Sequence, residues 1–216
     1  MRKSRLAKHQ QYKLVELFVA GATARTAAAI ADVNKTTASY YFQRLRQLIH
    51  AECEQGGVFE GAIELDQAVF SLKTAVRSKA TVEVKMPVWC VLQRSGKLYT
   101  LLLQEAEEGQ LVQALALKIR PNSVIYLNVD AHEDVALSLI QQGLEVVHSH
   151  LFADGEHHLN SIENFWIQAR RHLRKFNGVS EAYFHLFIKE CEWRFNERDP
   201  KVQLAMLKAL VQQHLA

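Results

Sequence analysis

Residues 160–178 read NSIENFWIQARRHLRKFNG, and their apolar side chains recur at steps of three and four positions. This period predicts an amphipathic helix that Asn160 caps and that ends before Gly178. The one acidic residue, Glu163, precedes Arg170 by seven positions, so two helical turns bring both side chains to nearly one edge. A carboxylate beside a basic stripe is what metal-assisted phosphodiester chemistry needs.

The basic side of this helix is suited to contact a phosphate backbone. Besides Arg170, it carries Arg171, Arg174 and Lys175. An amphipathic core helix with a solvated charged face is the alternative interpretation, because the same period is typical of both. The composition of this segment leaves both interpretations open.

Charge is unevenly distributed along the chain. The 216 residues carry a formal net charge of +3, and 49% of them are hydrophobic, which is enough for a buried core. Residues 1–52 contain nine Lys or Arg against Glu16, Asp32 and Glu52. A basic head on a nearly neutral body predicts an anionic partner for the head, and nucleic acid is the expected one.

Cysteine usage and hydropathy point to an intracellular chain. Cys53, Cys90 and Cys191 are scattered and odd in number, so neither a disulfide framework nor a CxxC zinc site is predicted. No apolar run approaches the roughly 18 residues of a membrane span, and the N-terminus lacks the apolar stretch of a signal peptide. We therefore expect a cytoplasmic protein without a membrane partner.

The basic head, residues 1–52, predicts three helices in a helix-turn-helix arrangement. The first helix ends at Gly21, Thr23 caps a second helix, and Asn34 caps a third helix over residues 35–49. Such a unit places its last helix in the major groove of DNA. Three packed helices with a basic solvent face are the alternative.

Two features of the head bear on this interpretation. Asp32 stands where the motif usually has Gly, so this aspartate must adopt or avoid a left-handed conformation. The residues that we expect on or near the outer face of the third helix, within reach of bases or phosphates, are Lys35, Thr36, Ser39, Tyr40 and Arg44.

Residues 58–178 predict an α/β core. The patterns indicate strands over 61–70, 82–92, 97–103, 123–129 and 144–150, and helices over 108–120, 132–142 and 160–178. Three strands followed by alternating helices and strands are the order of a ribonuclease-H-like mixed sheet with flanking helices. In that fold three acidic positions converge, and Asp66, the region 128–130 and Glu163 occupy them. We expect residues 179–216 to form two further helices that pack on this core.

Four segments resemble a known family: LFVAGATARTAA (17–28), VNKTTASYYFQRLR (33–46), LFADGEHHLNSIENFWIQARRHLRKFNG (151–178) and ECEWRFN (190–196). They are similar to the DDE-type transposases of small bacterial insertion sequences, in the short ISXO-type branch. The resemblance extends along nearly the whole chain. It implies an enzyme that binds terminal inverted repeats through its helix-turn-helix and then cuts DNA and joins it to target DNA with two divalent ions, Mg²⁺ or Mn²⁺.

The resemblance also implies roles for single residues. Carried over by position, Asp66 and Glu163 become catalytic metal ligands. Arg170 takes the place of the basic residue seven beyond the late Glu, where it would position phosphate because its guanidinium stays charged. Double-stranded DNA as partner, a homo-oligomeric form and a location at the bacterial nucleoid are further implications.

The chain departs from this family at the second acidic position. The family pattern IVYTDCY aligns with VIYLNVD, residues 124–130, and places Asn128 at the second catalytic Asp. An Asn carbonyl ligates a hard cation but brings no negative charge, so ion binding should weaken. Asp130 would face the same way, yet about 6.6 Å further along the strand. An alignment shift of two residues would instead put Asp130 in the catalytic position.

Several functions therefore stay open. The chain is either an active transposase or a decayed or domesticated copy that binds DNA and acts as a repressor or an inhibitor. A nuclease-like scaffold without DNA binding is a third hypothesis. The cluster His148, His150, His157 and His158 suggests zinc as a rival ligand, although its spacing matches no closed structural zinc site.

Overall fold

The computed structural model describes residues 3–75, 81–94, 96–102, 108–128, 131–148, 162–176 and 178–215. The chain divides into two compact units. One comprises Met1–Gln55, Leu173–Asn177 and Leu186–Ala216, and the other Gly56–His172 and Gly178–His185. Among the described residues, no helix has both the length and the apolar character needed to cross a bilayer.

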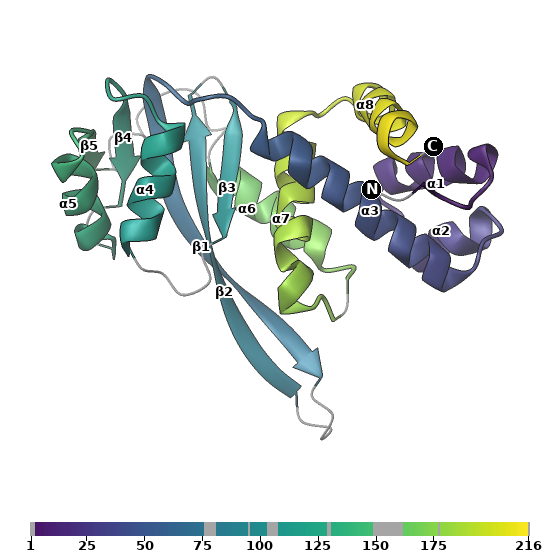
Figure 1. The fold of residues 1–216 in the computed structure, drawn as a ribbon. Helices are drawn as coiled ribbons and strands as arrows, with labels where there is room; N and C mark the ends of the chain where they lie inside the picture. Colours follow the sequence, from purple (N-terminus) through teal and green to yellow (C-terminus); the bar gives the residue numbers. More distant parts are fainter. Residues whose placement is uncertain are drawn as a thin grey trace. The chain divides into compact units, whose positions relative to one another are not determined.

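A five-stranded mixed sheet is the centre of the second unit (Figure 1). Its strands are β1 (Ala62–Ala75), β2 (Thr81–Gln93), β3 (Leu98–Leu102), β4 (Val124–Leu127) and β5 (Glu145–His148). Their order is β3-β2-β1-β4-β5, with β1, β2 and β3 antiparallel in succession and β4 and β5 parallel to β1. This topology is that of a ribonuclease-H-like fold, which confirms the predicted fold class.

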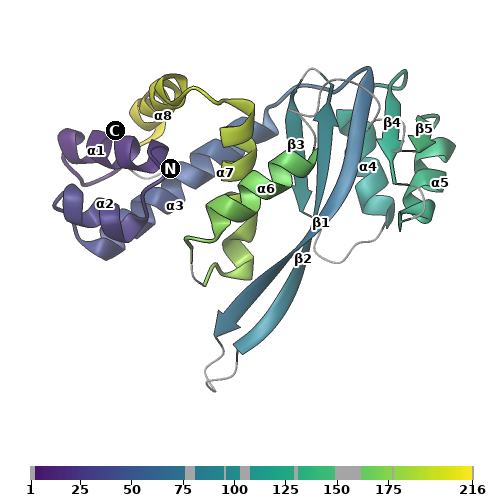
Figure 2. The same ribbon diagram turned by 180° about the vertical axis from the view of Figure 1, so that it is seen from behind.

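Different helices cover the two faces of the sheet, and the side chains of β1 point alternately to one face and the other. Ile63 and Leu65 are fully or almost fully buried in an apolar cluster with α4 (Glu108–Lys118) and α5 (Glu133–Gln141). Because side chains alternate along a strand, Glu64 and Asp66 belong to the opposite face. There α6 (Ile162–Leu173) packs, in front of the strands in Figure 2. The strand is also longer than predicted, since it continues past residue 70 to Ala75.

The first unit is entirely helical. It contains α1 (Lys8–Val19), α2 (Ala24–Ile30), α3 (Lys35–Glu54), most of α7 (Glu181–Asn196) and α8 (Pro200–His214). Thr23 and Asn34 cap α2 and α3 as the sequence predicts, by accepting hydrogen bonds from the N–H groups of Thr26 and Thr36. Asp32, before α3, adopts the left-handed conformation with φ 51°.

The C-terminal helices correct one expectation. We expected residues 179–216 to pack on the core, but residues 186–216 belong to the same unit as the N-terminal helices. Trp193, Leu207, Val211 and Leu215 are buried in one apolar cluster with side chains of α1 and α3. The apolar faces of α7 and α8 thus complete the core of the N-terminal helices.

A buried group of charges joins α3, α7 and the end of α1 within this unit. Glu190 accepts hydrogen bonds from Arg46 at 2.7 Å and from Arg194 at 2.9 Å, and the side chains of Arg46 and Glu190 are nearly inaccessible to solvent. Arg194 also donates to the carbonyl oxygens of Phe18 and Val19, the last residues of α1. One carboxylate therefore neutralises two cations, one of which caps a helix end.

Glu190→Gln should lower the free energy of unfolding by about 3–5 kcal/mol, because it leaves the buried guanidinium of Arg46 without its counter-charge. Urea titration measures this loss. Glu16→Gln, which removes a half-exposed carboxylate paired with Lys13 and Lys208, is the matched control and should cost less than about 1 kcal/mol. Equal losses in the two variants would contradict the prediction.

Candidate functional site

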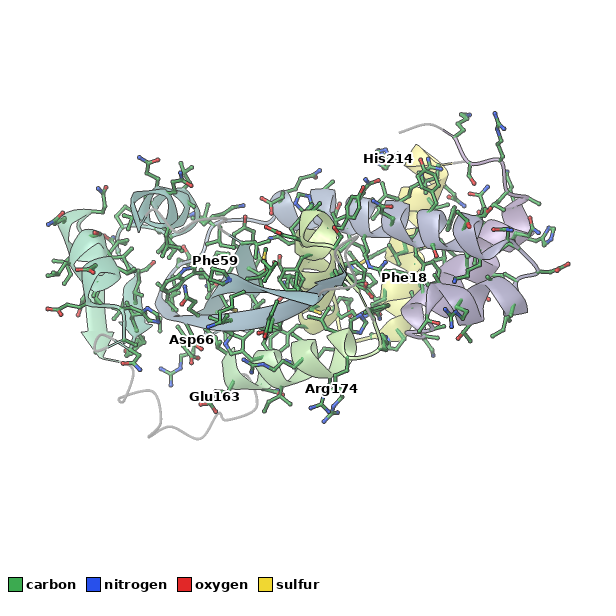
Figure 3. The ribbon with its side chains drawn as sticks, turned by 90° about the horizontal axis from the view of Figure 1, so that it is seen from below. Phe18, Phe59, Asp66, Glu163, Arg174 and His214 are labelled. Carbon is green, nitrogen blue, oxygen red and sulfur yellow. The ribbon has the colours of Figure 1, made fainter. Side chains whose placement is uncertain are left out.

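Two polar contacts join β1 to the start of α6. The indole Nε1–H of Trp166 donates to Asp66 Oδ2 at 2.9 Å. The backbone N–H of Ile162, the first residue of α6, donates to the carboxylate of Glu64. Figure 3 shows Asp66 on β1 and Glu163 at the start of α6. Trp166 is buried, and its indole also hydrogen-bonds the catalytic candidate Asp66.

Glu64 is the site residue that sequence reasoning missed. Its pKa is raised from 4.5 to about 7, mainly by burial and to a smaller extent by the charges of Asp66 and Glu163, while the hydrogen bond from the Ile162 N–H opposes the shift. The two carboxylates predicted to converge therefore lie close enough to act on a third. Period-two alternation along β1 was the available signal, because it puts Glu64 on the face of Asp66.

Asn128 lies beside Asp66 at the end of β4. The parallel register pairs Leu65 with Leu127, so the next residue on each strand is Asp66 or Asn128. The side chain of Asn128 is exposed. This register agrees with the ungapped alignment, whereas Asp130, the proposed substitute, lies outside the described residues.

The basic residues of α6 and of the two positions that follow it divide into exposed and partly buried ones. Arg170 and Arg171 are exposed, and the Arg170 guanidinium lies 5.6 Å from the ring centre of Phe70. Arg174 is also exposed, and in Figure 3 its side chain points away from the ribbon. We expected Lys175 to contact phosphate, but its Nζ donates to the Gly21 carbonyl oxygen at 2.8 Å. Burial also lowers the pKa of this ammonium group.

The candidate DNA-facing residues of α3 divide in a similar way. Lys35, Thr36, Ser39 and Tyr40 are exposed, Tyr40 at 60%. Arg44 corrects the expectation, because it is only 5% exposed and its guanidinium lies 5.8 Å from the Tyr40 ring centre. It falls one helical turn after Tyr40, beside buried Leu45, so its aliphatic stem is covered.

The side chains near Asp66 do not fit the pair of divalent ions expected from the sequence. Asn128 is neutral where a carboxylate is needed to offset the charge of two divalent ions. Within the described part of the chain, no three His, Cys, Asp or Glu side chains are arranged to hold a metal ion. The zinc hypothesis falls on residues 148–158, whose side chains lie outside the described set.

One family model and one sequence relative match this chain. Residues 58–196 match the family model described as "ISXO2-like transposase domain". An uncharacterized transposase-like protein of Haemophilus influenzae is 37% identical over 115 residues, which cover 53% of this chain and 94% of the relative.

Among solved structures, two complexes of Mos1 match at low similarity. The strand transfer complex gives a TM-score of 0.38 at 12% identity and covers 96% of this chain and 81% of that one. The paired end complex with Mn gives 0.27 at 15% identity, with 96% and 80% covered.

The raised pKa of Glu64 predicts that stability falls as pH rises from about 4.5 to about 7. In that window the unfolded chain releases the proton that the folded chain still holds, so deprotonation favours unfolding. The loss should be about 1–3 kcal/mol after allowance for partial exposure. Glu64→Gln keeps an acceptor for Ile162 but does not titrate.

Urea unfolding of the parent and Glu64→Gln between pH 4 and pH 8 measures this dependence. We expect the variant to become the more stable of the two as pH rises. A stability difference that stays constant over the whole range would show that Glu64 titrates normally.

Proposed function

The chain belongs to the family of ISXO2-like transposases, and from this membership we propose that it is a double-stranded DNA-binding protein that has lost strand cutting. It binds the terminal inverted repeats of an insertion sequence through its N-terminal helices. It acts as a repressor of that element or as an inhibitor of active relatives. The observation that carries the loss of cutting is the neutral Asn128 beside Asp66.

The exposed face of α3 supports DNA binding. Its first turns present Lys35, Thr36, Ser39 and Tyr40 to solvent, while Ala38 and Tyr41 on the opposite face are buried. An ammonium group, two hydroxyls and a phenol on one helix are the groups that contact phosphates and base edges in a major groove. The left-handed Asp32 and the Asn34 cap fix where this helix begins. We assign α1 to α3 as a helix-turn-helix on this basis.

Asn128 supports the loss of cutting through charge. Two divalent ions at one phosphodiester repel each other, and bridging carboxylates offset that charge. With Asn128 in the second position, the family's three acidic positions supply two charges in place of three. An active transposase that uses Asp66, Glu163 and Asp130 is the second candidate, and the electrostatic link of Asp66 and Glu163 to Glu64 favours it.

Lys35→Glu should weaken binding of duplexes taken from the DNA that flanks the gene by about tenfold or more, because it replaces a phosphate contact with a repulsion. A gel shift at several salt concentrations measures this loss, and the salt dependence should become less steep. Lys201→Glu, a charge reversal at an exposed position of α8, is the matched control and should bind as the parent does. Equal binding by the two variants would remove α3 from the interface.

Asn128→Asp should restore Mg²⁺- or Mn²⁺-dependent nicking of the duplexes that the parent only binds. The substitution returns one negative charge to the end of β4 without a change in side-chain volume. Nicking of a labelled duplex in a denaturing gel is the measurement. A parent that cuts as well as the variant would reject the loss of cutting and favour the second candidate.

A further inference from the structure

The chain has kept its other acidic residues around α6 although Asn128 has replaced one carboxylate. We infer that Glu64 and Asp66 serve in this chain as hydrogen-bond anchors that hold the start of α6 on β1, and not as ligands of paired metal ions. The second half of this inference rests on the proposed loss of cutting. The anchoring half does not depend on it.

The spacing of the two anchors matches the geometry of a strand and a helix. Glu64 and Asp66 are two residues apart on β1, a separation of about 6.6–6.8 Å on one face of a strand. Their donors, Ile162 and Trp166, are four residues apart on α6, a rise of about 6.0 Å along a helix. The structure contains both hydrogen bonds together, so the first turns of α6 lie along β1 from Glu64 to Asp66.

Each anchor accepts a hydrogen bond from a residue of α6 that is buried, Ile162 or Trp166. The first N–H groups of a helix have no acceptor within it, and the carboxyl group of Glu64 supplies one to Ile162. The Trp166 indole is 4% exposed and is packed between Phe70 and Phe165, with ring centres at 5.9 and 4.9 Å. Its buried N–H needs an acceptor, and Asp66 Oδ2 supplies it.

The same arrangement leaves little for a pair of cations. Asp66 Oδ2 is engaged by an N–H donor, Glu64 accepts from the backbone, and the neighbour of Asp66 on β4 is the neutral Asn128. Glu163, another described carboxylate on this face, is exposed. It directly follows Ile162, whose N–H donates to Glu64. With the neutral Asn128 as its neighbour on β4, Asp66 lacks the second carboxylate that would offset the charge of two divalent ions.

A double-mutant cycle in the full chain tests the anchor. Asp66→Ala and Trp166→Phe should each lower the melting temperature by about 4–8 °C, and the double variant should lose clearly less than the sum. Asp66→Asn keeps an oxygen acceptor and should recover most of the loss. Glu163→Ala, which removes the other family acid from an exposed position, is the matched control and should shift the melting temperature by less than about 2 °C. Additive losses, or equal effects of Asp66→Ala and Glu163→Ala, would overturn the anchoring role.

The melting temperature with added MgCl₂ or MnCl₂ tests the metal half. We expect no ion-dependent rise in the parent, and a rise in Asn128→Asp. A rise in the parent that Asp66→Asn abolishes would overturn the inference that Asp66 is not a ligand. Gel shifts with the parent report separately on DNA binding, so failure of the proposed function and failure of this inference give different results.

Discussion

The alternation of side chains along β1 is the constraint on which the sheet-containing unit depends. Ile63 and Leu65 pack in the apolar core with α4 and α5. Because side chains alternate along the strand, Glu64 and Asp66 lie on the opposite face, beside α6. A register shift of one residue would put two carboxylates into that core and two aliphatic side chains beneath α6. Because β1 is paired with β2 on one side and β4 on the other, its register also sets which residue of β4 lies beside Asp66.

The sequence carries enough information for the order of strands and helices along the chain and for the caps at Thr23 and Asn34, because these features depend on local period and turn chemistry. The approach of β1 to the helix of Glu163 was expected from the ribonuclease-H-like order of these elements. Glu64 was harder to find, since nothing local distinguishes a buried carboxylate under a helix from an exposed one on a half-buried strand. The burial of Arg44 and the contact of Lys175 with Gly21 were also beyond prediction, because both depend on which distant segment covers a side chain. Residues 186–216 are apolar enough to pack on either unit, and only the tertiary contacts decide which.

Basic residues in the helical unit have two distinct tasks. Arg46 and Arg194 share Glu190, and the guanidinium of Arg46 lies 3.9 Å from the ring centre of Phe187, so both cations serve the interior of the fold. Lys35 and the other exposed cations of this unit remain accessible to an anionic partner. The nine Lys and Arg of residues 1–52 therefore overstate the charge that the head presents to a partner.

The helical unit is assembled from three separate stretches of chain, with α7 and α8 supplying Trp193, Leu207, Val211 and Leu215 to the core built by α1 and α3. During synthesis the N-terminal helices emerge from the ribosome long before those partners exist, and their apolar faces stay uncovered until the last residues are released. Translation that stops early, or a frameshift after the sheet, therefore yields a chain whose N-terminal helices lack half of their packing. Such products should be removed by proteases because they expose apolar surface.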